Sequence, residues 1–371
     1  MDSDLKTWTE ASLYSFCNPK QWPTIPQNAF TENGYPVYGA NGKIGFYNEF
    51  NHEKPTVLIT CRGATCGAIN VCEAKSYVTG NSMALDDLDE ARVDLKFLVY
   101  ALRNHGLGKA ITGTAQPQIT RESLTSVKVP LPPLNQQRRI AAIMDKADEL
   151  RAKRRTAIAK LDRLTQSIFL DMFGDPIANT RSWDLRPLND LGAVERGVSK
   201  HRPRNAPELL GGPYPFVQTG DVANCDGYIR TYSATYSDIG LRQSRLWPAG
   251  TLCITIAANI AKTGILTFDA CFPDSVVGFR AEERATVEFV RLWLSFLQKN
   301  LEKKAPESAQ KNINLEILRA LEVPNPGIEL QRKFTRRIDA IERCKIVGHR
   351  AIHEYNMLFA SLQHRAFRGE L

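Results

Sequence analysis

The sequence predicts an α+β fold in which two globular domains are separated by two long antiparallel helices that form a coiled coil. Two proline-free stretches of about forty residues carry apolar side chains at three- and four-residue spacing, which is typical of long helices. The segments around them are rich in glycine, proline and short β-branched runs, which favours compact sheets. An internal repeat with an offset of 194 residues predicts that both halves share one architecture, related by a pseudo-two-fold axis.

The composition is that of a soluble globular protein. The chain has 371 residues, 43% hydrophobic and 24% charged, a length that suits roughly two to four domains. Apolar runs such as residues 57–59 are far shorter than the ~20 residues that span a bilayer, which argues against a membrane protein. The first five residues lack the features of a secretory signal, and none of the eight cysteines forms a CxxC pair. We therefore expect a cytoplasmic protein with reduced thiols.

The positive charge is concentrated in the two segments with helical spacing. The net charge is +8, of which residues 134–175 carry +3 and residues 328–371 carry +4. A basic chain favours a polyanionic partner such as nucleic acid. Prolines precede both segments, which marks the start of each helix. The predicted order is a first globular domain (1–133), a central helix (134–175), a second globular domain (176–327) and a C-terminal helix (328–371).

Each long helix carries an apolar stripe with heptad spacing. The first stripe comprises Ile140, Ile143, Ala147, Leu150, Arg154, Ala157, Leu161, Leu164 and Ile168. The second comprises Phe334, Ile338, Ile341, Cys344, Ala351, Tyr355, Leu358 and Leu362. Because each stripe needs a partner, we expect the helices to pack antiparallel against each other.

The two helices are copies of one another. Val129-Pro130 corresponds to Val323-Pro324, and Gln137-Arg138 corresponds to Gln331-Arg332. Chance similarity between amphipathic helices is disfavoured, because the matching prolines and a repeated Ala-Gln pair lie outside the helices. The similarity continues more faintly into the globular segments. There we expect strands at 57–60, 127–129, 251–256 and 264–268, and short helices at 95–104 and 287–303.

Three segments resemble a known protein family. They are Val-Pro-Leu-Pro-Pro-Leu-Asn-Gln-Gln-Arg-Arg-Ile (129–140), Leu-Thr-Gln-Ser-Ile-Phe-Leu-Asp-Met-Phe-Gly-Asp (164–175) and Tyr-Pro-Phe-Val-Gln-Thr-Gly-Asp-Val (214–222). Together with the repeat, they make the chain similar over essentially its whole length to the specificity subunit of type I restriction-modification systems. The helical segments are the specific part of this resemblance.

The resemblance implies a non-catalytic, sequence-specific DNA-binding subunit in a system of DNA methylation and defence against foreign DNA. The globular domains would be target recognition domains that read a bipartite site in double-stranded DNA. Two adenine methyltransferase (modification) subunits and the restriction/translocase subunits would assemble on the chain. S-adenosylmethionine, ATP and Mg are then expected on those partners and not on this chain. The alternative is a non-catalytic coiled-coil scaffold that binds protein partners.

No motif of an enzyme of this kind is present in the sequence. Residues 18–21 and 325–328 do not match the Asn/Asp-Pro-Pro-aromatic motif that holds a flipped adenine, and residues 39–43 lack the spacing of a P-loop. His349 and His353 lie one helical turn apart, but off the apolar stripe, so a surface pair is favoured over a zinc site. The sequence therefore predicts neither a catalytic residue nor a metal ligand.

Candidate DNA contacts lie in loops of both globular domains, because Arg and Lys suit phosphates and guanine, and Asn and Gln suit adenine. In the first domain they are Asn41, Lys43, Arg62, Thr65, Gln116 and Gln118. In the second domain they are Ser199, Lys200, Arg202, Arg204, Gln218, Thr219, Asp221, Asn259, Lys262, Gln310, Lys311 and Asn312. Three alternatives stay open. Residues 199–204 can be a solvated loop, and residues 218–221 a turn capped by its own side chains. Gln116 and Gln310 belong to an Ala-Gln pair that occurs in both domains, which favours a structural or phosphate-contacting role over base reading.

Cations on the long helices are candidates for docking of partner subunits. They are Arg138, Arg139, Arg151, Arg154, Arg332 and Arg336. A solvated helix face is the usual role of such charges, and both interpretations stay open.

Overall fold

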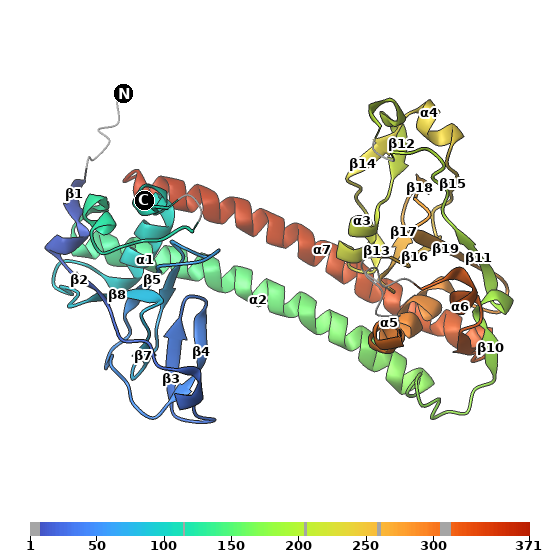
Figure 1. The fold of residues 1–371 in the computed structure, drawn as a ribbon, viewed down its shortest axis with the longest axis horizontal. Helices are drawn as coiled ribbons and strands as arrows, with labels where there is room; N and C mark the ends of the chain where they lie inside the picture. Colours follow the sequence, from blue (N-terminus) through green and yellow to red (C-terminus); the bar gives the residue numbers. More distant parts are fainter. Residues whose placement is uncertain (1–7, 114–115, 204–205, 258–260, 305–312) are drawn as a thin grey trace. The chain divides into compact units, whose positions relative to one another are not determined.

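The computed structural model describes residues 8–113, 116–203, 206–257, 261–304 and 313–371, without the side chains of 299–304 (Figure 1). The chain forms two compact units. Unit 1 comprises Met1–Thr156 and Arg350–Leu371, and unit 2 comprises Ala157–His349. Each long helix therefore contributes one part to each unit. Within the described ranges, no helix is long and apolar enough to cross a membrane.

The two long helices form where the periodicity predicts them. α2 spans Leu134–Phe173 and α7 spans Ile328–Phe367, 40 residues each, so each is about 60 Å long at 1.5 Å per residue. β9 (Lys128–Leu131) leads into α2, and β20 (Glu322–Pro324) leads into α7. Each of these strands pairs antiparallel with the first strand of its unit: β1 (Thr9–Ser12) with β9, and β10 (Leu185–Pro187) with β20.

Unit 1 contains two further sheets and a short helix. The first sheet has the order β2 (Asn18–Gln21), β8 (Ser82–Asp86), β5 (Val57–Thr60), β6 (Ile69–Val71), all antiparallel. The second has the order β4 (Gly42–Tyr47), β3 (Tyr35–Gly39), β7 (Tyr77–Val78), with β3 and β7 parallel. α1 (Leu95–His105) begins at Asp94, whose carboxylate accepts a hydrogen bond from the backbone of Phe97.

Unit 2 repeats this topology. Its first sheet has the order β11 (Gly192–Arg196), β19 (Val276–Ala281), β16 (Leu252–Thr255), β17 (Thr263–Leu266), β13 (Tyr228–Ile229). Its second has the order β14 (Ala234–Tyr236), β12 (Leu210–Phe216), β18 (Ala270–Cys271), β15 (Leu246–Trp247). The helices are α3 (Thr219–Asn224), α4 (Asp238–Arg242), α5 (Val287–Lys304) and α6 (Leu315–Arg319).

The strand orders confirm the internal repeat. The order β2-β8-β5-β6 corresponds to β11-β19-β16-β17, and β4-β3-β7 corresponds to β14-β12-β18. The parallel pair β3–β7 recurs as the parallel pair β12–β18. Among the described strands, β13 and β15 extend the sheets of unit 2 without a counterpart in unit 1. The predicted short helices are present as α1 and α5, and predicted strands are present as β5, β9, β16 and β17.

Each unit buries its parts of the two helices against its own core. In unit 1, Ile140 and Met144 of α2 join the core of Phe97 and Ile59, and Phe359 and Phe367 of α7 pack against it. In unit 2, Phe169 and Phe173 of α2 lie in an aromatic cluster with Phe289 and with Phe334 of α7. Because the early part of one helix meets the late part of the other in each unit, the helices pack antiparallel, as predicted.

The predicted stripe is wrong at one of its two heptad positions along part of each helix. Ala157 and Leu164 are exposed, while Ile158, Thr165 and Phe169 are buried in their place. Cys344 and Leu358 of α7 are likewise exposed, and Lys345 is buried. The buried positions still keep a seven-residue spacing: Met144, Ile158 and Thr165 follow it on α2. Gln331, Ile338 and Lys345 follow it on α7. The heptads are therefore present, and the prediction placed one of their two core positions one residue too early.

A buried glutamine joins each long helix to the helix before it. Gln137 accepts a hydrogen bond from the Asp94 N–H and donates to the carbonyl oxygens of Arg92 and Pro132, at 2.8–2.9 Å. Its repeat partner Gln331 accepts from the Thr286 N–H at 2.9 Å and donates to the carbonyls of Arg284 and Pro326 at 3.2 and 2.8 Å. The repeat therefore preserves a hydrogen-bonded joint as well as a sequence.

Candidate nucleic-acid interface

Three loops of unit 1 bring the first-domain candidates together. The β3–β4 turn carries Asn41 and Lys43, and it is held at the sheet by hydrogen bonds from Thr60 to the Ala40 carbonyl (2.6 Å) and from Ser82 to the Gly39 carbonyl (3.0 Å). The hydroxyl of Thr65 in the next loop donates to the Asn41 side-chain oxygen at 2.8 Å. Arg62 of that loop forms a backbone bridge with Gln118. The geometry thus joins residues that are far apart in sequence.

The side chains at this cluster are available to a ligand. Asn41, Lys43, Arg62, Thr65, Gln116 and Gln118 are all exposed. Lys43 lies over the ring of Phe46, with its ammonium 4.6 Å from the centroid, which supports the side chain from one side. Exposed guanidinium, ammonium and amide groups of this kind can donate to phosphates and to base edges.

The basic loop of unit 2 is ordered by its own hydrogen bonds. The side-chain oxygen of Gln243 accepts from the backbone N–H groups of Lys200 and His201 at 2.7 and 3.0 Å. Arg202 donates to the Ser199 carbonyl (2.6 Å) and pairs with Asp274 (3.1 Å). Ser199 is buried, so it does not fit the predicted direct DNA contact. Lys200 is exposed and is the candidate of this loop that remains best placed to contact DNA.

The Gln218–Asp221 segment begins α3, and Asp221 has a structural role there. Its carboxylate accepts hydrogen bonds from the Gln218 N–H at 2.8 Å and from the Ser233 hydroxyl at 3.1 Å. This geometry favours the capped-turn interpretation for Asp221, whereas Gln218 is exposed. Thr219 and Lys262 are half-buried. Arg204, Asn259, Gln310, Lys311 and Asn312 lie outside the described residues.

The helical cations fall into two groups. Arg138, Arg139, Arg332 and Arg336 are exposed, and Arg154 is half-buried. Arg151 is engaged between the helices: it donates to the Asn356 side chain at 2.9 Å and pairs with Asp148 at 2.9 Å. Its guanidinium also lies 4.4 Å from the ring centroid of Phe359. These contacts favour helix pairing as the role of Arg151 and leave the exposed arginines as docking candidates.

A comparison with known protein families decides between the two functional interpretations. The sequence model of the type I restriction modification DNA specificity domain matches residues 5–161 and 180–354. The chain belongs to this family. The two matched ranges correspond to the two repeats, so two specificity domains lie in tandem. Family membership supports a role in DNA sequence specificity and does not favour the protein-scaffold alternative.

Individual relatives agree with the family assignment. A putative type I specificity subunit of Mycoplasma pneumoniae is 24% identical over 356 residues, 91% of both chains. The EcoprrI specificity subunit of Escherichia coli is 30% identical over 116 residues, which cover 31% of this chain and 28% of that protein. The crystal structure of the type I restriction-modification S subunit from M. genitalium has the same fold, with a TM-score of 0.68 at 17% identity, covering 99% of this chain and 98% of that one.

A buried cluster of charged side chains in unit 2 was not predicted from the sequence. The ammonium of Lys345 on α7 lies 2.8 Å from Asp162 of α2, 2.6 Å from Asp226 and 3.1 Å from Glu342. Lys345 is only 4% exposed. Burial lowers the pKa of Lys345, but the three carboxylates outweigh it and raise the pKa above its usual value. The available signal was the position of Lys345 seven residues after the buried Ile338, but the prediction placed the neighbouring Cys344 in the stripe because it is apolar.

The equivalent position in the first repeat has related chemistry. With the offset of 194 residues, Lys345 corresponds to Arg151, Glu342 to Asp148, and Asn356 to Asp162. Each cation pairs with the acid three residues before it and with a side chain of the opposite helix. The duplicated helices therefore carry one polar node in each unit, at matching positions.

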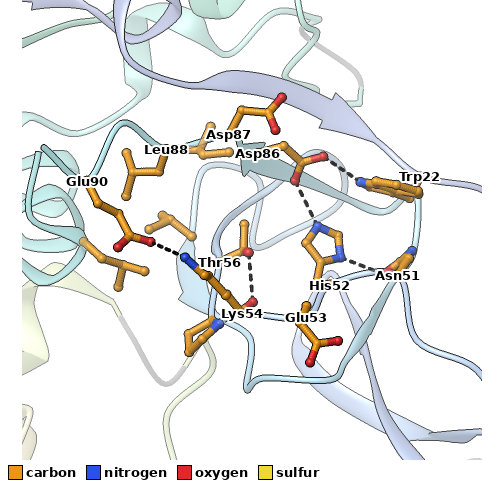
Figure 2. A pocket seen from close by; sticks show the side chains of 14 residues that line it. Trp22, Asn51, His52, Glu53, Lys54, Thr56, Asp86, Asp87, Leu88 and Glu90 are labelled. Atoms are coloured by element: carbon orange, nitrogen blue, oxygen red, sulfur yellow. Dashed lines mark hydrogen bonds and ion pairs between the residues drawn. The ribbon is translucent and has the colours of Figure 1, made fainter. Parts of the chain in front are cut away.

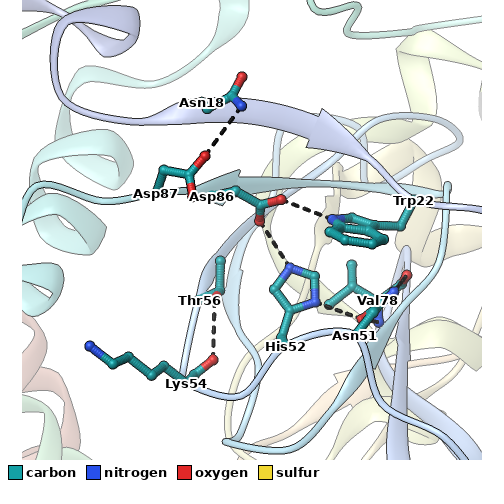
Figure 3. A network of polar contacts seen from close by, with 9 residues as sticks. All are labelled: Asn18, Trp22, Asn51, His52, Lys54, Thr56, Val78, Asp86 and Asp87. Carbon is teal, nitrogen blue, oxygen red and sulfur yellow. Dashed lines mark hydrogen bonds and ion pairs between the residues drawn. The ribbon is translucent and has the colours of Figure 1, made fainter.

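A histidine–aspartate pair at a pocket of unit 1 is also part of a structural network (Figure 2). His52 lies 2.9 Å from Asp86 and 2.6 Å from the Asn51 side-chain oxygen, and Asp86 also accepts from the Trp22 indole at 3.0 Å. Asn51 is oriented by two hydrogen bonds with the Val78 backbone (Figure 3). Its oxygen therefore faces the second ring nitrogen of His52.

This network does not form a nucleophilic catalytic site. The second ring nitrogen of His52 faces an amide and not a hydroxyl or thiol, so the arrangement lacks the nucleophile of a triad. The pocket has a volume of about 410 Å³ and is lined by the acidic residues Glu53, Asp87 and Glu90 as well as Asp86. Among the described residues, no group of three His, Cys, Asp or Glu could hold a metal ion. The network joins the loop before β5 to strands of both sheets.

Proposed function

We propose that the chain is a non-catalytic specificity subunit that reads a bipartite site in double-stranded DNA, one half-site with each globular domain. The observation that carries the proposal is the duplicated topology: two domains of the same strand order, each joined through a buried glutamine to a 40-residue helix. Two independent cores present different loops, so each domain can read its own sequence. A continuous helix between the domains suits a reader of two separated half-sites.

In the first domain, the joined loops around Asn41, Arg62 and Gln118 are the proposed reading surface. In the second domain we propose Lys200 and Gln218 among the described candidates, together with the undescribed loop positions predicted above. Arg202 and Asp221 would then act by shaping their loops, because their side chains are engaged within them.

The helices are the proposed docking site for two adenine methyltransferase subunits. Arg138 and Arg332 occupy matching positions of the repeat and are both exposed. Leu164 and Leu358 also match and are 46% and 48% exposed, respectively. Two similar surfaces suit two copies of one partner, which would place one methyltransferase over each half-site. S-adenosylmethionine would be bound by those subunits, and ATP and Mg by restriction subunits.

Domain exchange with a methyltransferase partner tests the proposal. The isolated chain should transfer no methyl group from labelled S-adenosylmethionine, and activity should appear when the methyltransferase subunit is added. Replacing residues 177–325 by the equivalent domain of a relative should change one half-site of the methylated sequence and leave the other unchanged. Turnover by the pure chain, or an exchange that alters both half-sites, would refute the proposal.

A further inference from the structure

The second globular domain is attached to the helices of unit 2 by two ion pairs from one short segment. Asp226, after α3, reaches Lys345 at 2.6 Å, and Arg230, after β13, donates to Glu342 at 3.1 Å. Asp226 also lies 3.5 Å from His349, one turn further along α7. Lys345 continues the chain of contacts to Asp162 on α2 at 2.8 Å. The segment between α3 and β14 is thus tied to both helices through one buried ammonium.

This attachment is specific to the second repeat. The segment contains β13, which has no counterpart among the described strands of unit 1. At the matching node of unit 1, the described partners of Arg151 are Asp148, Asn356 and Phe359, all of which lie on α2 or α7. The segment with the extra strand therefore adds Asp226 and Arg230 to the charged cluster on the helices. In unit 1, the described contacts of Arg151 come from the two helices alone.

The charges of the cluster favour one position of the second domain on the helices of unit 2. A buried ammonium is costly unless carboxylates surround it, and removal of one partner leaves unpaired charge. The side chain of Lys345 is 5% exposed and that of Glu342 is 8% exposed, whereas those of Asp226 and Arg230 are 45% and 37% exposed, so the helix partners are shielded from water and the domain partners only in part. Burial raises the pKa of Asp226, but Lys345 and His349 outweigh this and lower it below its usual value. A domain shifted along the helix would lose both pairs.

We propose that Asp226 and Arg230 are positioning residues that fix the orientation of the second recognition domain on the helix pair, and thereby set how strictly the protein measures the spacer between half-sites. This inference rests on the proposed DNA-reading function. Loss of the two pairs should let the domain rock on its apolar contacts. The half-site sequences would then stay the same while the tolerated spacer lengths widen.

The test is the double variant Asp226→Ala with Arg230→Ala in the complex with methyltransferase subunits. The change is neutral in charge and leaves Lys345 paired with Asp162 and Glu342. Methylation is measured on duplexes that differ only by one base pair in spacer length. We expect the preference for the native spacer to fall about tenfold, which corresponds to 1.4 kcal/mol. A variant that merely loses stability would lower methylation of every duplex in proportion.

A matched control exists within the same domain. Glu195 and Arg245 form an ion pair of 2.6 Å, and Arg245 lies over Trp247 much as Arg230 lies over Tyr228. Glu195→Ala with Arg245→Ala removes the same charges without touching the helix node, and the spacer profile should stay that of the wild type. An unchanged profile for Asp226→Ala with Arg230→Ala would overturn the inference.

Two measurements separate this inference from the proposed function. If the wild-type complex has no bipartite preference, the proposed function fails. If it has one and the double variant keeps the same spacer profile, only the inference fails. Hydrogen exchange of the free chain gives a readout without DNA: amides of residues 226–230 should exchange faster in the double variant, and unchanged protection would also overturn the inference.

Discussion

The buried glutamine joints allow one prediction to be tested twice in the same molecule. Gln137→Leu and Gln331→Leu keep the side chain close in size but remove the amide. Each variant leaves one backbone N–H and two backbone carbonyls without their partner. Gln137 is 1% exposed and Gln331 is 0% exposed, so water has little access to these groups.

The expected cost follows from counting those groups. Three orphaned backbone groups cost about 1–3 kcal/mol each, or about 3–9 kcal/mol together, and a buried leucine returns about 1.5–3 kcal/mol. The middle of these ranges gives an expected loss of about 4 kcal/mol of unfolding free energy for each variant. Equilibrium urea unfolding measures the loss. Hydrogen exchange locates it, because faster exchange should be confined to the start of α1 for Gln137→Leu and to the start of α5 for Gln331→Leu.

Gln136→Leu is the matched control, because it changes the same residue type at the neighbouring, half-buried position. Its effect should stay within about 0.5 kcal/mol. Losses below about 1 kcal/mol for both Gln137→Leu and Gln331→Leu would show that the hydrogen bonds are not the source of the joint's stability. A loss in only one variant would contradict the equivalence of the two repeats.

The remaining predictions concern DNA, thiols, acid and the helices. If Lys200 contacts a phosphate, Lys200→Ala should reduce the slope of log binding constant against log salt concentration by roughly 1, with sequence preference unchanged. An unchanged slope would show that Lys200 does not contact DNA. Native thiol labelling should modify Cys344 first, because it is exposed, whereas burial raises the pKa of Cys17 to about 12 and of Cys61 to about 11; labelling of Cys17 as fast as Cys344 would contradict this. Asp226 has a lowered pKa, so its contribution to stability is present above its usual pKa of 3.8 and is lost as pH falls through the lowered folded-state value, which acid titration with hydrogen exchange of residues 226–230 can follow. One heptad inserted after Ala157 and one after Ala351 should lengthen the helices by about 10 Å, or roughly three base pairs, and rotate one half-site by about 100°. Methylation should then shift to a longer spacer or lose strength, and continued preference for the original spacer in a folded variant would show that the helices do not set the distance.

Much of the fold was predictable because it depends on local patterns. Proline before each proline-free stretch placed the starts of α2 and α7 at their observed residues, Leu134 and Ile328, and the predicted segments end two and four residues beyond the observed helices. The matching Gln137 and Gln331 signalled the repeat, although only the structure shows that both bond the preceding helix. The prediction placed one core position of the later heptads one residue too early, because apolar side chains such as Ala157, Leu164 and Cys344 stand next to the buried positions.

The sequence predicted which loops carry the candidate residues, but not which of their side chains are free to contact a ligand. Loop position and side-chain type identified Asn41, Arg62 and Thr65, and the structure brings them together. The same reasoning selected Ser199 and Asp221, because residue type alone cannot distinguish a buried hydroxyl or a capping carboxylate from one that faces DNA. The local pattern could place Lys345 in the buried stripe, but its partners Asp162 and Asp226 come from distant parts of the chain, so only the structure reveals the cluster.

The clusters around Arg151 and Lys345 show which features the two repeats share and which differ between them. Position is preserved, because Arg151 and Lys345 occupy equivalent sites and each pairs with an acid three residues earlier. The link to the globular domain has diverged, because Lys345 contacts Asp226 of the second domain while Arg151 stacks on Phe359 of its partner helix. A symmetric helix pair suits two identical partner subunits, whereas domains that differ in loops and attachment suit two different half-sites. The asymmetry of a bipartite site would therefore originate in the domains, and its fixed spacing in the helices together with the one additional tether at Asp226 and Arg230.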